Sequence, residues 1–199
     1  MKFLIKIFLT MCCILTCFSF SSISVFASES DENLIYEKNG WVFRVTTYEE
    51  MIKDIAEIDG ITIERAYELY PNKETKSTTS KIIVAYRAID VTPVYRPRVE
   101  IRLRATFVDG EVVAIEEILH AVLDRKSTVS PYIVRQFNGN LIFNKEDDKT
   151  IFLALSGDFY NYGTTTMTGS INKGIFKFTI SGASNHYSPV DFEEYLVIK

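Results

Sequence analysis

Cysteine is absent from most of this chain of 199 residues, because all three cysteines, Cys12, Cys13 and Cys17, lie near its start. The rest of the chain can form no internal disulfide and has no thiolate to act as a nucleophile or zinc ligand. Histidine is nearly as scarce, since His120 and His186 are the only two. No P-loop, GxGxxG or GxSxG pattern occurs either. These absences exclude the usual thiol-dependent and nucleotide-dependent mechanisms.

The first 27 residues have the pattern of a secretory signal peptide. Lys2 and Lys6 stand before an apolar stretch that ends in small residues at Ala27. This pattern predicts cleavage after Ala27 and no stable membrane span afterwards. A lipid anchor on Cys17 is not favoured, because Thr16 before it is a poor match to the processing motif. We therefore expect a secreted, extracellular protein, with association at the cell surface as an alternative.

Basic residues are outnumbered by acidic ones. Removing Lys2 and Lys6 with the signal peptide leaves 20 basic and 26 acidic side chains, a net charge near −6. Nucleic-acid binders are usually basic, so a nucleic acid is not an expected partner. Residues 55–70 have helix-turn-helix spacing, but Glu64 and Glu68 in the would-be recognition helix would repel phosphates. The expected partners are an envelope polymer, an anionic surface or another extracellular protein.

The exported chain is predicted to be a single domain behind a short leader. Residues 28–39 are acidic with little apolar content, so they are expected to form a flexible leader. One β-rich domain then spans residues 40–199. Thr47 and Thr62 are placed to cap two short amphipathic helices, which predicts a helical hairpin over residues 47–70.

Strand patterns dominate the remainder. A polar loop, residues 71–80, is followed by an antiparallel sheet expected over residues 81–199. Asp109–Gly110 is the clearest hairpin turn. Residues 111–123 fit both a strand and a helical period, and the tight turn before them favours the strand. The fold class is therefore mainly β, of α+β type, with an antiparallel β-sandwich or closed barrel and a small N-terminal helical hairpin.

A row of arginines is the least ordinary polar feature. The segment "RVEIRLRATF" alternates strictly, so its arginines are expected on one exposed face, joined by an arginine of the neighbouring strand. Such a row could bind acidic groups by bidentate pairing. Alternatively, these arginines pair with Glu111 and with Glu116 or Glu117 across the hairpin. The candidate binding residues are Arg87, Arg98, Arg102 and Arg104.

Tyr160 and Tyr162 form a second candidate surface. They stand beside several threonines in "DFYNYGTTTMTGS", and exposed tyrosines make adaptable contacts and can stack on sugars. A threonine-rich edge strand without a ligand is the alternative.

A catalytic alternative rests on His186. It shares the expected loop 181–189 with Ser184 and stands five residues before Asp191. Triads are normally assembled from separate segments, so an ordinary turn is the favoured interpretation. No metal site or cofactor is predicted. The sequence thus predicts a secreted, non-enzymatic binding protein of the cell envelope or extracellular surface, with a hydrolase using His186 and a loop carboxylate as the alternative.

Overall fold

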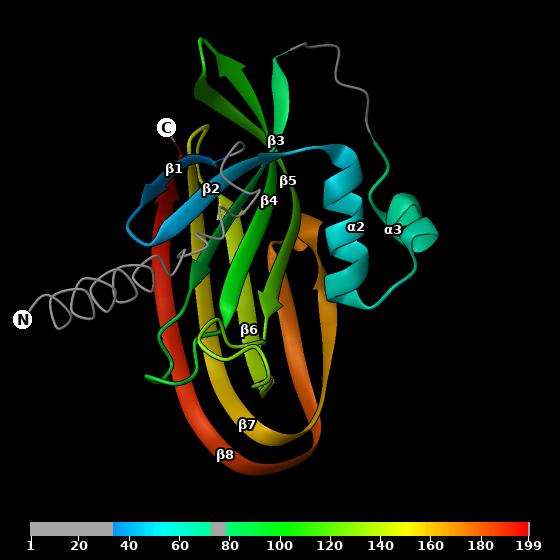
Figure 1. The fold of residues 1–199 in the computed structure, drawn as a ribbon, viewed down its shortest axis with the longest axis vertical. Helices are drawn as coiled ribbons and strands as arrows, with labels where there is room; N and C mark the ends of the chain where they lie inside the picture. Colours follow the sequence, from blue (N-terminus) through cyan, green and yellow to red (C-terminus); the bar gives the residue numbers. More distant parts are fainter. Residues whose placement is uncertain (1–33, 73–78, 199) are drawn as a thin grey trace, which may run out of the picture. The chain divides into compact units, whose positions relative to one another are not determined.

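The structure, a computed structural model, describes residues 34–72 and 79–198. The predicted signal peptide, residues 1–27, and the first part of the acidic leader lie outside the described residues. Two antiparallel sheets pack against each other, and two short helices cover the outer face of the first sheet (Figure 1). This confirms the mainly β fold class with a helical hairpin, and it has the form of a sandwich.

The first sheet has five strands in sequence order: β1 (Leu34–Lys38), β2 (Trp41–Thr46), β3 (Ser80–Ala88), β4 (Arg98–Val108) and β5 (Glu111–Asp124). The turn between β4 and β5 is the expected one, with φ of 52° at Asp109 and 85° at Gly110. The prediction that 111–123 is a strand is confirmed. Strand β1 differs from the flexible leader expected there, because Tyr36 stacks on Phe43 of β2 at 4.2 Å.

The two helices are α2 (Tyr48–Asp59) and α3 (Ile63–Leu69). A capping box starts α2, in which the Thr47 hydroxyl accepts a bond from the Glu50 amide and the Glu50 carboxylate accepts one from the Thr47 amide. Gly60, with φ of 66°, ends α2 in the left-handed conformation. The helical hairpin predicted over 47–70 is confirmed.

The second sheet is built by three strands: β6 (Gln136–Lys145), β7 (Thr150–Ser170) and β8 (Ile175–Val197), with a short 3₁₀ turn, η2 (Ile171–Lys173), between the last two. Each strand pairs with both of the others, because β7 and β8 are long and bend at the lower end of Figure 1. The second half of β7 pairs only with β8. The resulting order is second half of β7, first half of β8, β6, first half of β7, second half of β8.

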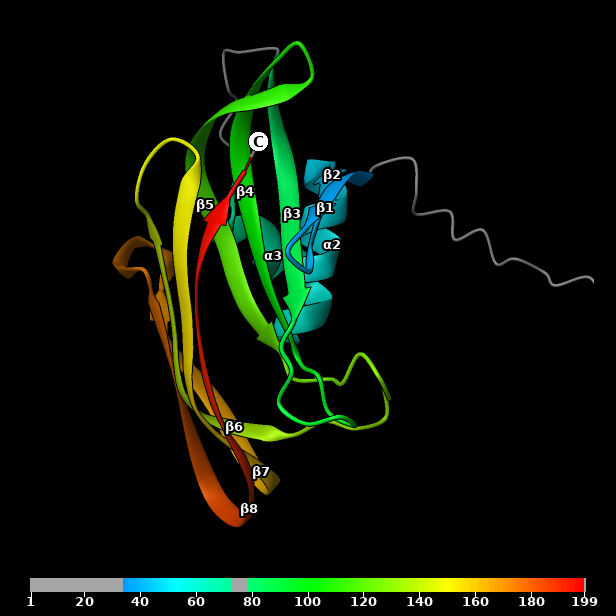
Figure 2. The same ribbon diagram turned by 90° about the vertical axis from the view of Figure 1, so that its left-hand side faces the viewer.

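The main core lies between the sheets, which Figure 2 shows side by side with α2 beyond the first sheet. Its fully buried members include Phe43, Ile83, Ile101, Leu103, Phe137, Phe143, Leu153 and Phe159. A smaller cluster under the helices joins Met51, Ile52, Ile55, Ala56 and Ala66 to Ile82 of β3. The first sheet is therefore buried on both faces beneath α2.

Tyr95, in the connection between β3 and β4, predicts how stability depends on alkaline pH. Its ring is fully buried against Phe159 and Tyr187, and its hydroxyl donates to the Arg125 carbonyl at 2.9 Å. Burial raises the pKa of Tyr95 well above its usual range. Unfolded tyrosine ionises near pH 10, so the free energy of unfolding should fall as pH rises above about 10.

Urea unfolding at a series of pH values measures this fall. Tyr95→Phe is expected to be less stable than the unsubstituted protein at neutral pH, because it lacks the hydrogen bond, yet to lose less stability above pH 10. If the free energy of unfolding of the two proteins fell in parallel above pH 10, Tyr95 would not be the source of the pH dependence.

Candidate ligand-binding cleft

The arginines of β4 do not form an exposed row. Arg102 and Arg104 are only 1% and 7% exposed, because α2 lies over this face of the sheet. Arg98 is partly exposed. Arg87 lies on the opposite face, since its register partner Val99 points into the core between the sheets. The prediction of a single exposed row containing these four arginines is therefore wrong.

The buried Arg102 belongs to a polar cluster between β4, β5 and α2. Its guanidinium contacts the carboxylates of Glu100 and Asp54, and it donates to His120 Nδ1 at 3.2 Å. A guanidinium can only donate, so Nδ1 of His120 accepts and its proton is on Nε2. That nitrogen lies 3.1 Å from Asp59 Oδ2 and donates to it. His120 thus links the sheet to the end of α2.

The other arginines are also paired. Arg104 Nε lies 3.1 Å from Glu117 on β5, which confirms the cross-strand alternative for that residue. Arg98 contacts Glu100 at 3.2 Å and Asp124 at 3.7 Å, and its guanidinium lies 5.0 Å from the centre of the Tyr86 ring.

Arg87 connects the two sheets. It pairs with Glu194 of β8, and the same carboxylate accepts a 2.8 Å bond from the Trp41 indole. The Arg87 guanidinium also lies over the Phe192 ring, 5.2 Å from its centre. These contacts make Arg87 a structural residue.

His186 does not lie in a loop. Residues 181–189 belong to the bent part of β8, where His186 Nε2 is 2.8 Å from Asp158 Oδ1 on β7. Asp191 stands opposite Ser156, and Ser184 opposite Tyr162. The structure therefore does not bring His186 together with Ser184 and Asp191, and the loop prediction was wrong because register shifts, not a turn, accommodate the bend.

Tyr160 and Tyr162 lie on the outward face of β7 at this bend. The Tyr160 ring makes an edge contact with His186 at 5.5 Å, whereas Tyr162 is 62% exposed. The threonines that follow lie on the second half of β7, which is an edge segment of its sheet.

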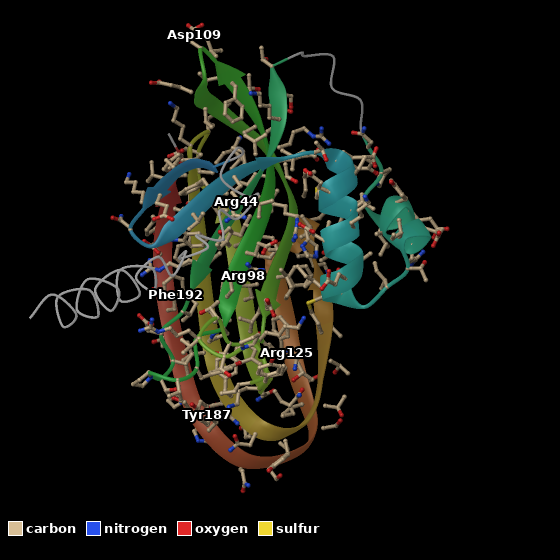
Figure 3. The ribbon with its side chains drawn as sticks, viewed as in Figure 1. Arg44, Arg98, Asp109, Arg125, Tyr187 and Phe192 are labelled. Carbon is tan, nitrogen blue, oxygen red and sulfur yellow. The ribbon has the colours of Figure 1, made fainter. Side chains whose placement is uncertain are left out.

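A cleft of about 750 Å³ opens at the side of the sandwich where β5 and the second half of β7 are edge strands. It lies toward the end of β5 near Arg125, far from the Asp109 turn (Figure 3). Strand β5 and the second half of β7 form two walls of the cleft, and the ends of α2 and α3 form a third. The volume is in the range of ligand-binding pockets. The main apolar side chains of the lining are Ile58, Leu69, Leu123, Val134, Met167, Ile171, Phe176 and Phe178.

Polar groups stand around this apolar lining. Burial raises the pKa of Tyr70 to about 12, and its hydroxyl has no hydrogen-bond partner within the described part of the chain. Burial likewise lowers the pKa of Arg125. Glu57 and Lys126 form no ion pair with another described residue. The cleft therefore combines an apolar floor with a few groups that can orient a ligand.

Comparisons of the chain with models of known protein families, with curated proteins and with solved structures give no match.

Over residues 34–72 and 79–198, no group of three or more His, Cys, Asp or Glu side chains is placed to hold a metal ion. None of the helices in this part of the chain has the length and apolar character to cross a membrane.

The cleft leaves no clear pattern in the sequence. Its lining comes from segments as distant as Glu57 and Phe178, which only the fold brings together. The available signal is weak: Leu69 and Met167 are apolar residues in segments that otherwise look polar.

Proposed function

We propose that this protein is a secreted, non-enzymatic binding protein that acts at the cell envelope or outside the cell, and that its ligand occupies the cleft between β5 and β7. The observation that carries the proposal is the exposed apolar rim: Leu69, Val134 and Met167 are 47%, 43% and 41% exposed around one concavity. Apolar surface gathered at a cleft is typical of binding sites.

The chemistry of the cleft supports binding over catalysis. The nearest acid–base pair is Asp59 with His120, but His120 is 1% exposed and both of its ring nitrogens are engaged by Arg102 and Asp59. A general base needs a nitrogen within reach of the substrate. His186, on which a hydrolase would depend, is not part of the cleft lining.

The exposed Tyr162 ring supports a further contact with an envelope polymer. Of the two tyrosines it is the exposed one, it stands beside the exposed Thr164 and Thr166, and aromatic faces make adaptable contacts with polar partners. With Arg102 and Arg104 buried, this surface is a better candidate for such a contact than the arginines of β4.

Binding of the fluorescent apolar dye anilinonaphthalene sulfonate tests the cleft. The folded protein should enhance the dye's fluorescence, and Met167→Glu should weaken binding about tenfold, because it places a charge in the apolar lining. Val108→Glu is the matched control, since Val108 is 50% exposed outside the cleft. Equal affinities of the two variants, or no dye binding by a folded protein, would rule out the cleft as the site.

A further inference from the structure

We infer that the ligand of the cleft is an extended polypeptide segment with apolar side chains, which adds to the edge of β5 as one more strand. This inference rests on the proposed function, because it names the chemical class that the cleft binds.

The first argument is the unpaired backbone at the cleft. Strand β5 pairs only with β4, and no described residue forms a hydrogen bond with the outer backbone edge of β5 between Leu119 and Asp124. In an antiparallel ladder, alternate residues direct their amide and carbonyl groups to the outer side. A polypeptide presents complementary groups at the same spacing, which is the basis of strand addition.

The second argument is that part of this edge lacks the usual protection against pairing. Proteins guard exposed edges with charged side chains, prolines or bulges. A register shift at Leu119 interrupts the β4–β5 pairing, but beyond it, from His120 to Leu123, the strand pairs regularly and reads "HAVL", with no proline, lysine or carboxylate. At the usual rise of a strand, the regular edge from His120 to Asp124 is about 16 Å long and can hold about five residues of an extended segment.

The third argument is the charge of the two walls. Glu57 on the helical wall and Lys126 just beyond the end of β5 carry opposite charges, and neither forms an ion pair with another described residue. An amphiphile with one charged head would match only one wall, whereas a peptide carries charges of both signs along its length. The unpartnered Tyr70 hydroxyl can in addition donate to a peptide carbonyl.

The experiment is selection from a phage library of short random peptides, followed by affinity measurements on synthetic peptides from the enriched sequences. For a bound strand, N-methylation at one set of alternate residues should weaken affinity about a hundredfold, because those amides donate to β5. N-methylation of the other set should change affinity little. Met167→Glu should weaken the peptide and the dye together, whereas Val108→Glu should weaken neither.

Other outcomes separate this inference from the proposed function. If decanoate displaces the dye while no peptide is enriched, the cleft binds a lipid-like ligand; strand addition is then wrong and the proposed function stands. If selected peptides lose affinity equally for both methylation patterns, strand addition is wrong although the cleft binds peptides. A concentration-dependent dimer that Met167→Glu abolishes would identify a second copy of this chain as the occupant. If a folded protein binds neither dye, peptide nor decanoate, both proposals fail.

Discussion

Replacing Arg102 with methionine is expected to lower the free energy of unfolding by about 3 to 5 kcal/mol, measured by urea denaturation. Arg102 is 1% exposed and neutralises the Glu100 carboxylate, which is buried with it under α2. Methionine preserves much of the side-chain volume but leaves the buried Glu100 carboxylate to Arg98 alone and His120 Nδ1 without a donor. Removing one partner of a buried ion pair costs more than the pair contributes, because the other charge stays buried.

Two further variants test this explanation. The double variant Arg102→Met with Glu100→Gln should recover part of the lost stability, because the buried carboxylate charge that Arg102 neutralised is gone. Arg96→Met is the matched surface control, since Arg96 and its partner Asp90 are largely exposed, and it should change stability by less than about 1 kcal/mol. Equal effects of Arg102→Met and Arg96→Met would contradict the burial of this cluster. Because Arg102 is buried, replacing it with an acidic residue would report on folding and could not test whether Arg102 binds a ligand at the surface.

Gly157→Ala is expected to destabilise the protein by about 2 to 5 kcal/mol. Gly157 of β7 faces Gly139 of β6, and a Cβ at Gly157 would lie 2.2 Å from the Asn138 carbonyl oxygen and 2.9 Å from the Phe137 ring. Its φ of 152° is also unfavourable for a side chain. Both the close approach of the strands and the packing of Phe137 therefore require glycine.

Gly60→Ala is the control for this substitution. Gly60 also has a positive φ, of 66°, but no atom lies within 4 Å of the position that its Cβ would take. Gly60→Ala should therefore lower the free energy of unfolding by only about 1 to 2 kcal/mol, the cost of placing alanine in the left-handed backbone conformation. If thermal or urea unfolding gave equal losses for Gly60→Ala and Gly157→Ala, the steric explanation would be wrong.

Local rules account for the parts of the fold that sequence predicted correctly. The Thr47 cap, the Asp109–Gly110 turn and the alternation from Val99 to Phe107 each depend on a few neighbouring residues. They predicted the helical hairpin, the β4–β5 hairpin and the core face of β4. The mainly β class follows from the same signals.

Features that depend on what covers a surface could not be predicted in this way. Alternation separates Arg102 from Leu103, but it does not say that α2 will bury the arginine face as well. In the same way, Asn and Gly are common in turns, yet Asn138-Gly139-Asn140 lies inside β6, where Gly157 faces Gly139 across the strand pair. The cleft was missed for a related reason, since two strand edges form it only after both sheets have assembled.

The pairing of β8 has a consequence for how the chain reaches its native state. Residues 175–178 pair with both β6 and the second half of β7, and the rest of β8 returns along β7 as far as Val197. These contacts join distant segments, and contacts of this kind slow folding because long loops must close first. Until β8 docks, β6 and β7 keep unpaired edges that favour aggregation. The chain is thus expected to fold slowly and to depend on its last strand for solubility during folding.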